Sequence, residues 1–422
     1  MKVLLISANT EKINILPLPL GLNCIATATR NSGHHVTLLD LMMQTETQRI
    51  IKETIDSCCP DVIGISVRNI DDQKMDKPKF IIDDVKTIVR CCRSLSNAPI
   101  VLGGAGYSIF PQSALTYLEA DMGIQGEGEI AFPDLLDRME KKADLSGTPG
   151  LYMNDFGLQG KRTFANNLDA LPLSGDVSFW HSEDRKLWMP FQTRRGCPMN
   201  CSYCSTSTIE GRTIRKRSPQ TVVNDLVSLA EAGFGKFYFV DNVFNFPASY
   251  AKNICQSIIE KQLDITWRAI LYPYKLDEAL IHLMAEAGCR EVSLGFESGS
   301  EEILHNMNKK FTLREIQETS HMLAHHGIRE MGFLLLGGPG ETQETVLQSL
   351  SFADSLPLNE LKITSGIRIY PGTTLQKTAI SDAVILPDDN LLFPKFYMVK
   401  GLEEWLHKTV TAWAADRPHW II

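Results

Sequence analysis

Three cysteines lie close together in the segment RRGCPMNCSYCS, at Cys197, Cys201 and Cys204. The segment follows an apolar run typical of a strand, and its glycine and proline favour a loop over a helix. Three thiolates on one loop can converge on one metal centre. A structural zinc ion takes four protein ligands, but the next cysteine is Cys255 and the next histidine is His282. The spacing therefore predicts a 4Fe-4S cluster with one iron left open.

Four further motifs each span the end of a predicted strand: YFVDN at Tyr238–Asn242, GFESGS at Gly295–Ser300, LGGPGET at Leu336–Thr342 and RIYPGT at Arg368–Thr373. Together with CxxxCxxC and an aromatic residue before the last cysteine, they resemble the radical S-adenosylmethionine (SAM) superfamily over about Trp188–Leu375. The set is most similar to the branch shared by cobalamin-binding radical SAM proteins, methylthiotransferases and Elongator-like enzymes. This resemblance implies that SAM chelates the open iron. It also implies a SAM site formed by Tyr203, Asp241, Asn242, Glu297, Ser298, Gly338 and Tyr370.

These lesser motifs also have purely structural interpretations. The glycines of LGGPGET can form a strand-to-helix turn, and Glu341 and Thr342 can serve the first turn of the following helix. Asp241 and Glu297 can be a helix cap or half of an ion pair instead of ligands of SAM. The basic residues at 212–217 can be a solvated face. The cysteines outside the loop fall in helical or strand segments and are expected to be core residues.

The second half of the chain must position these residues. Six apolar runs alternate there with helical segments, which predicts a partial (β/α)6 TIM-like barrel with its chemistry at the carboxyl ends of the strands. The predicted strands are Met189–Thr193, Lys236–Val240, Trp267–Leu271, Glu291–Gly295, Gly332–Leu336 and Ile363–Ile369.

The first half also alternates short strands with amphipathic segments, which predicts a doubly wound, Rossmann-like parallel sheet. Its predicted strands are Val3–Ser7, Val36–Asp40, Val62–Ser66, Ile100–Leu102 and Met122–Gln125. Ligands of such sheets bind beyond the carboxyl ends of the strands. Glycine and small polar residues cluster at those ends here.

A sheet of this kind in front of a radical SAM barrel resembles a cobalamin-binding domain, over about Met1–Glu140. The implied cobalamin contacts are Leu20, Gly21, Ser66, Arg68, Gly103, Gly104, Gly106, Tyr107, Gly126 and Glu127. A nucleotide-binding or purely structural sheet is the alternative, although GxGxxG is absent after the first strand. The DxHxxG motif of many cobalamin domains is also absent, so the lower face of cobalt is expected to be open, water-bound or met by a side chain of Val67–Pro78.

The predicted fold class is therefore α/β in two domains. The expected boundaries are 1–140 for the cobalamin-binding domain, 141–187 for a linker, 188–378 for the radical SAM barrel and 379–422 for a short C-terminal cap. The linker is predicted because the segment is rich in glycine, asparagine, aspartate and proline.

Charge, hydropathy and cysteine content limit the classes of partner and the compartment that we expect. The formal net charge of −8 comes from residues spread along the chain, so no nucleic-acid partner is expected. The N-terminus lacks a cleavage site, and no apolar run reaches transmembrane length. Ten cysteines without a secretory signal indicate reduced thiols, so we expect a cytoplasmic protein. The expected partners are a small-molecule substrate and a reductant such as flavodoxin or ferredoxin.

The resemblance implies an enzyme that methylates an unactivated carbon of a small molecule or natural product through a 5′-deoxyadenosyl radical. Radical cyclisation, oxidation or rearrangement without methyl transfer is one alternative, and a non-catalytic corrinoid carrier or sensor is another. A methylthiotransferase is disfavoured because the N-terminal cysteines lack the spacing of a second cluster. The sequence identifies no catalytic acid or base.

Overall fold

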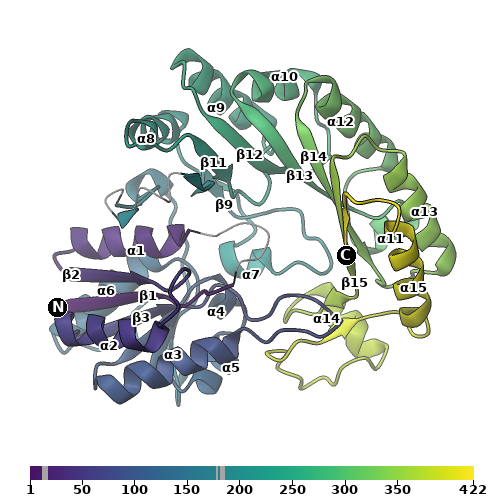
Figure 1. Cartoon of the computed structure of the whole chain (residues 1–422). Coiled ribbons are helices and arrows are strands. Elements are labelled where there is room, and N and C mark those ends of the chain that lie inside the picture. The colour runs from purple at the N-terminus through teal and green to yellow at the C-terminus, as the bar shows by residue number, and fades with distance from the viewer. Residues whose placement is uncertain (12–17, 177–178, 181–185) are drawn as a thin grey trace.

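The structure is a computed structural model of the 422-residue chain, and it describes residues 1–11, 18–176, 179–180 and 186–422. Part of the loop after the first predicted strand and part of the predicted linker therefore lie outside the described residues. Two sheets face one another, with helix α7 (Thr206–Glu210) between them (Figure 1). This arrangement brings the carboxyl ends of both sheets toward a common region.

The N-terminal sheet has the strand order β2-β1-β3-β4-β5-β6-β7. Its first five strands are parallel, as predicted, while β6 and β7 add an antiparallel edge. The strands are β1 Lys2–Ser7, β2 His35–Asp40, β3 Val62–Ser66, β4 Ile100–Gly103, β5 Met122–Ile124, β6 Leu151–Met153 and β7 Gly157–Leu158. The last two lie within the segment expected to be a linker.

Helices cover both faces of this sheet because alternate strand residues point to opposite sides. In β1, Val3 and Leu5 pack in one apolar cluster, and Leu4 and Ile6 pack in another. The helices are α1 Leu20–Asn31, α2 Thr47–Cys58, α3 Ile82–Leu95, α4 Ala105–Ile109, α5 Pro111–Leu118 and α6 Gly128–Glu140. The predicted doubly wound arrangement is confirmed.

The second sheet is an open, all-parallel barrel sheet with the order β18-β15-β14-β13-β12-β11-β8. Its strands are β8 Met189–Phe191, β11 Lys236–Phe239, β12 Thr266–Leu271, β13 Cys289–Glu297, β14 Arg329–Leu336, β15 Glu360–Ser365 and β18 Trp420–Ile421. Its outer helices are α8 Pro219–Glu231, α9 Ala248–Glu260, α10 Glu278–Glu286, α11 Glu301–Asn306, α12 Leu313–His325, α13 Gln343–Asp354 and α15 Glu403–Ala414.

Residues of the barrel strands alternate between fully buried and half-buried positions. In β14, Glu330, Gly332, Leu334 and Leu336 are buried, while the residues between them stay half-buried. The buried set packs toward the outer helices, so the half-buried set lines the concave side. The barrel's own side chains therefore do not fill its interior.

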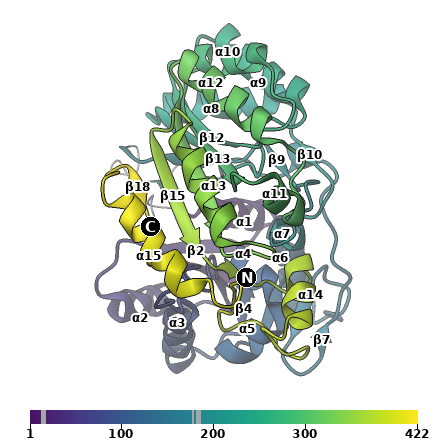
Figure 2. The ribbon, with the colours of Figure 1, turned by 90° about the vertical axis from the view of Figure 1, so that its right-hand side faces the viewer.

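Two details of the second half differ from prediction. The run expected as one strand at Ile363–Ile369 is divided, because Gly366 adopts a positive φ of 78° and β16 (Ile367–Arg368) turns away to pair antiparallel with β17 (Phe396–Tyr397). The expected boundary between barrel and cap falls inside helix α14 (Thr374–Ser381), and the tail then carries α15 and ends in β18, which joins the sheet beside β15 (Figure 2).

Candidate active site

The three-cysteine loop connects β9 (Arg194–Arg195) to α7. Gly196 starts it with a positive φ of 91°, and a Cβ there would lie 2.2 Å from the carbonyl oxygen of Thr213. Only glycine fits such a turn without displacing backbone. The loop is also fixed at its far end, where the Ser202 amide donates to the Met307 carbonyl at 3.0 Å.

Glu210, which the sequence did not single out, anchors this loop from α7. Its carboxylate accepts hydrogen bonds from the Gly196 amide at 3.0 Å, the Gln192 side chain at 2.8 Å and the Asn242 side chain at 2.5 Å. Burial raises the pKa of Glu210, and the Gly196 and Gln192 donors act against that shift. The position just before Gly211 gives no sequence signal for such a role.

The three thiols of the loop are half-buried and close together. Burial first, and then the neighbouring Cys204 and Cys201, raise the pKa of Cys197 to about 11. Three thiolates that interact on one loop can each bind a different iron of a 4Fe-4S cluster and leave its fourth iron without a protein ligand.

A buried polar triad lies beside the loop. The Tyr203 hydroxyl donates to Glu297 Oε1 at 2.8 Å, and Lys309 Nζ donates to the same oxygen at 3.2 Å. Burial by itself lowers the pKa of Lys309, but Tyr203 and Glu297 together raise it well above its usual value. Lys309 is close enough to Cys201 to lower that thiol's pKa, although burial dominates and raises it. Lys309 is a site residue that the motifs did not indicate.

Asp241 and Ser298 make their hydrogen bonds within the protein. Asp241 is fully buried, accepts bonds from the Thr193 amide at 2.7 Å and hydroxyl at 2.6 Å, and lies 3.4 Å from Arg194 Nε. The Ser298 hydroxyl lies 3.0 Å from that of Ser349 on α13. The structure thus places Asp241 in the ion pair that was its alternative interpretation.

The glycine-rich turn after β14 also carries its own acceptor. The buried carboxylate of Glu341 accepts hydrogen bonds from the amides of Gly337 and, at 3.1 Å, Gly338. Burial raises the pKa of Glu341 to about 7. Tyr370, after β16, lies near Cys204 and next to Arg368, whose guanidinium is 5.3 Å from its ring centre.

A cavity of about 320 Å³ lies where the two domains meet. The N-terminal domain contributes seven of the ten predicted cobalamin residues, and the barrel contributes Gln192, Arg195 and Glu210 from around the cysteine loop. Those seven are Leu20, Gly21, Ser66, Arg68, Gly104, Gly126 and Glu127. Arg68 forms no hydrogen bond or ion pair with any residue the structure describes, so its charge is available to a ligand.

A second, narrow cavity of about 40 Å³ continues from this region between the N-terminal sheet and its α1–α6 face. Gly103 lines it, and a Cβ at Gly103 would meet no atom within 4 Å. A Cβ at Gly21 in the larger cavity would also project into open space. The two adjoining cavities expose glycine backbone, which a corrinoid ring and its nucleotide tail would need for close approach.

Three predicted cobalamin residues either lie outside the larger cavity or are held by contacts within the protein. Gly106 packs on the carbonyl of Arg68, and Tyr107 is fully buried with its ring against Gly123; neither lines the larger cavity. Glu127 lines the cavity, but it also forms an ion pair with Arg215 and accepts the Ala165 amide at 2.7 Å. Its carboxylate therefore fixes protein segments at the domain junction.

Comparisons with known proteins agree with this geometry. The chain matches the Radical SAM superfamily over residues 192–353 and the B12 binding domain over residues 7–136. An uncharacterised methyltransferase of Pyrococcus horikoshii is 29% identical over 402 residues, covering 92% of this chain and 84% of the relative. The tryptophan 2-C-methyltransferase of Streptomyces laurentii is 23% identical, covering 88% and 73%. The hopanoid C-3 methylase of Methylococcus capsulatus is 26% identical, covering 94% and 78%.

Solved structures share the whole architecture. The radical SAM methyltransferase TsrM from Kitasatospora setae, solved with cobalamin and a 4Fe-4S cluster, superposes with a TM-score of 0.88 at 21% identity, covering 100% of this chain and 90% of that one. The cobalamin-dependent enzyme OxsB, solved with aqua-cobalamin and SAM, gives 0.79 at 18% identity, covering 98% and 66%. The chain thus carries both a radical SAM domain and a B12 binding domain, and it has the fold of the cobalamin-dependent radical SAM enzymes.

Proposed function

We propose that the protein transfers a methyl group from SAM to an unactivated carbon atom of a small-molecule or natural-product substrate. The observation that carries the proposal is the cavity between the domains, because residues of the cobalamin-binding sheet and residues around the cysteine loop line the same space. Relatives named for methylation at C-2 of tryptophan and at C-3 of hopanoids support it.

When bound, the 4Fe-4S cluster, SAM and cobalamin supply reductive cleavage of SAM and carriage of the methyl group. In this proposal Cys197, Cys201 and Cys204 hold the cluster. Tyr203 and Lys309 fix the carboxylate of Glu297 beside it, where the carboxylate can receive SAM's amino group or ribose hydroxyls. Asn242, Gly338 and Tyr370 complete the SAM site. In this proposal the protein's side chains bind and orient the cofactors, and none of them acts as a catalytic acid or base.

The remaining parts of the proposal concern the surroundings of the enzyme. None of the described helices combines the length and apolar character that a membrane-spanning helix needs. We place the protein in the cytoplasm, where thiols stay reduced, with flavodoxin or ferredoxin as the electron donor.

A labelling experiment tests the activity. Protein reconstituted anaerobically with iron, sulfide and cobalamin is incubated with reductant, a substrate extract and SAM carrying a deuterated methyl group. A product heavier by one labelled methyl is expected, together with 5′-deoxyadenosine. The Cys201→Ala variant should lose both. A product without the label would favour cyclisation, oxidation or rearrangement, for which the 23% identical anaerobic magnesium-protoporphyrin IX monomethyl ester cyclase of Rubrivivax gelatinosus is a precedent.

Filling the cavity tests its assignment separately. Gly21→Leu places a side chain where a Cβ meets no protein atom within 4 Å, so the protein should fold while the chamber becomes smaller. We expect cobalamin binding to weaken at least tenfold, about 1.4 kcal/mol, and iron content to stay normal. Gly235→Leu, also in open space but outside this cavity, is the matched control. Equal cobalamin binding by both variants would contradict the assignment.

A further inference from the structure

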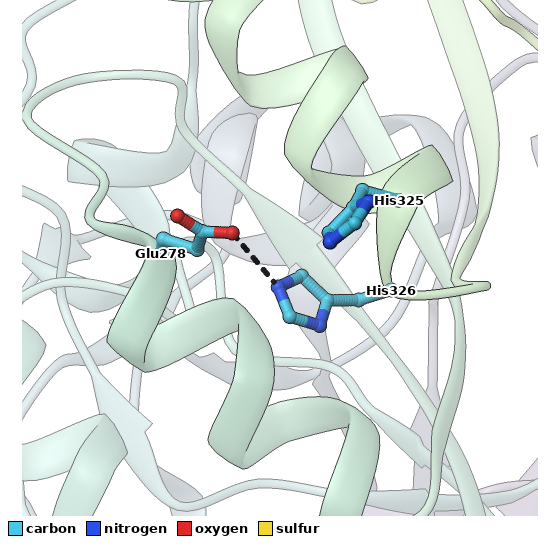
Figure 3. A group of neighbouring side chains, drawn as sticks. All are labelled: Glu278, His325 and His326. Carbon is cyan, nitrogen blue, oxygen red and sulfur yellow. Dashed lines mark ion pairs between the residues drawn. The ribbon is translucent and has the colours of Figure 1, made fainter.

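Two histidines and a glutamate from neighbouring barrel helices gather on the outer layer of the molecule (Figure 3). Glu278 is the first residue of α10, His325 is the last residue of α12, and His326 follows directly. One ligand atom from each lies within 4.8 Å of the others. Figure 1 places both helices on the side of the barrel sheet remote from the N-terminal domain. This group is therefore separate from the cavity described above.

The end of α12 explains how adjacent histidines reach one side. Consecutive residues of a continuous helix point about 100° apart. His326 caps the helix, and Gly327 takes a positive φ of 68°, so the chain leaves the helix at this point. The two imidazole rings have centroids 5.1 Å apart with planes at 82°, and both lie on the side of Glu278 (Figure 3).

The distances approach those of a coordinated ion. Ligands at about 2.1 Å from a tetrahedral Zn²⁺ lie about 3.4 Å from one another. His326 Nε2 and Glu278 Oε1 are already 3.4 Å apart. The group as a whole spans up to 4.8 Å, so the third ligand would have to move by roughly an ångström. His325 is exposed and can change rotamer to do so.

His326 is the most enclosed member of the group. Its side chain is 16% exposed, and its buried Nε2 atom lies 3.4 Å from Glu278 Oε1 without forming a hydrogen bond. The other groups facing it are the Glu278 carboxylate and the ring of His282, whose centroid lies 5.5 Å away and whose own Nε2 is 3.5 Å from Glu286. A buried imidazole nitrogen needs either a hydrogen-bond partner or a bound metal ion.

We propose that Glu278, His325 and His326 bind a divalent transition-metal ion, with Zn²⁺ the best match, and that this ion joins α10 to the end of α12. Two imidazoles and one carboxylate suit Zn²⁺, Co²⁺ and Ni²⁺, whereas Mg²⁺ and Ca²⁺ take oxygen ligands. Three protein ligands leave a fourth position for water. Because the site lies on the outer helices, the ion stabilises the helix pair and takes no part in SAM cleavage.

Calorimetric titration of ZnCl2 into the cluster- and cobalamin-loaded protein tests the site. We expect one saturable equivalent, a higher thermal midpoint with Zn²⁺, no response to MgCl2 and no loss of iron. His325→Gln and Glu278→Gln, both changes at exposed side chains, should each weaken binding at least about tenfold, since even second-shell changes cost that much. His321→Gln is the matched control, because His321 is exposed on the same helix outside the group.

Three results would overturn the proposal. One is the absence of a saturable equivalent in the unaltered protein. Another is equal binding in the His325→Gln and His321→Gln variants, which would indicate scattered surface histidines. The third is zinc uptake matched by iron release, which would place the ion in the cysteine loop. Iron content and absorbance before and after titration separate this last case from the proposed site.

Discussion

At the scale of single residues, Lys309 balances the negative charge of the Glu297 carboxylate next to the cysteine loop. Its side chain is 4% exposed and its ammonium group is 3.2 Å from Glu297 Oε1. Glu297 also holds a positive φ of 67°, a conformation that non-glycine residues adopt only when neighbours fix them. Lys309 therefore positions the carboxylate that is proposed to receive SAM.

Replacing Lys309 by methionine should lower the free energy of unfolding by about 3 kcal/mol, because a buried carboxylate loses its counter-charge. Thermal and urea midpoints measure the effect. Lys310→Met, at the exposed neighbour, should change them little. Adding Glu297→Gln to Lys309→Met should recover part of the loss, because the unpaired charge is then removed. Additive effects of the two changes would show that the pair is not coupled.

Residue types and spacing were sufficient to predict the cysteine loop, since the three proposed cluster ligands lie close together in the sequence. They could not predict which polar side chains are satisfied by the protein itself. Asp241 bonds to Thr193 and Arg194, which lie far from it in the chain. Glu210 and Lys309 stand in no motif, and only the folded arrangement brings them to the loop. Long-range partners are invisible to local spacing.

At the scale of elements, alternation of apolar runs predicted five strands of the first sheet and located all six expected strands of the second. The misjudged segments are short or interrupted. β18 has two residues and lies at an edge, so its apolar run is too short to predict a strand. The division between β15 and β16 depends on the positive φ of Gly366, where the Met75 side chain of the N-terminal domain packs closely. A tertiary contact fixes that break.

The contact between β14 and α12 contains a buried acid, Glu330. Its Oε1 accepts the Ser320 hydroxyl at 3.0 Å, while Oε2 is buried without a hydrogen-bond partner among the described residues. Burial raises its pKa from 4.5 to about 7. Because the folded pKa lies above the unfolded value, the folded state holds the proton more tightly. Its contribution to stability is complete below pH 4.5 and is lost as the pH rises through 7.

Glu330→Gln should therefore reduce the loss of stability between about pH 4.5 and 8 by up to about 3 kcal/mol, which the thermal midpoint measured across that range reports. Glu341, whose pKa is also about 7, still contributes to the dependence of the thermal midpoint on pH in this variant. Glu318→Gln, on the exposed side of α12, is the control and should leave the slope unchanged. A Glu330→Gln variant with the original slope would show that this carboxyl does not titrate in the folded protein over that range.

At the scale of the whole molecule, buried charge pairs join the two domains. Arg195, next to the cysteine loop, lies 2.5 Å from Glu129 at the start of α6 and 3.4 Å from Glu127. On the other side of the interface, Asp71 and Arg368 form a second buried pair at 2.8 Å. The cysteine loop is thus attached to the helix that covers the predicted cobalamin slot. The sequence analysis singled out Gly126 and Glu127 of this segment as cobalamin contacts but gave no reason to expect partners in the barrel.

Glu129→Gln tests whether this attachment positions the loop. The change keeps the shape of the side chain but removes its charge, and Arg195 retains only the more distant Glu127, so we expect a loss of about 2 kcal/mol in stability. Looser anchoring should also reduce the iron retained after anaerobic gel filtration. Glu140→Gln, at the exposed end of the same helix, is the control. If iron retention and thermal midpoint match the control, the ion pair does not hold the loop, and the short contacts of Glu210 must hold it alone.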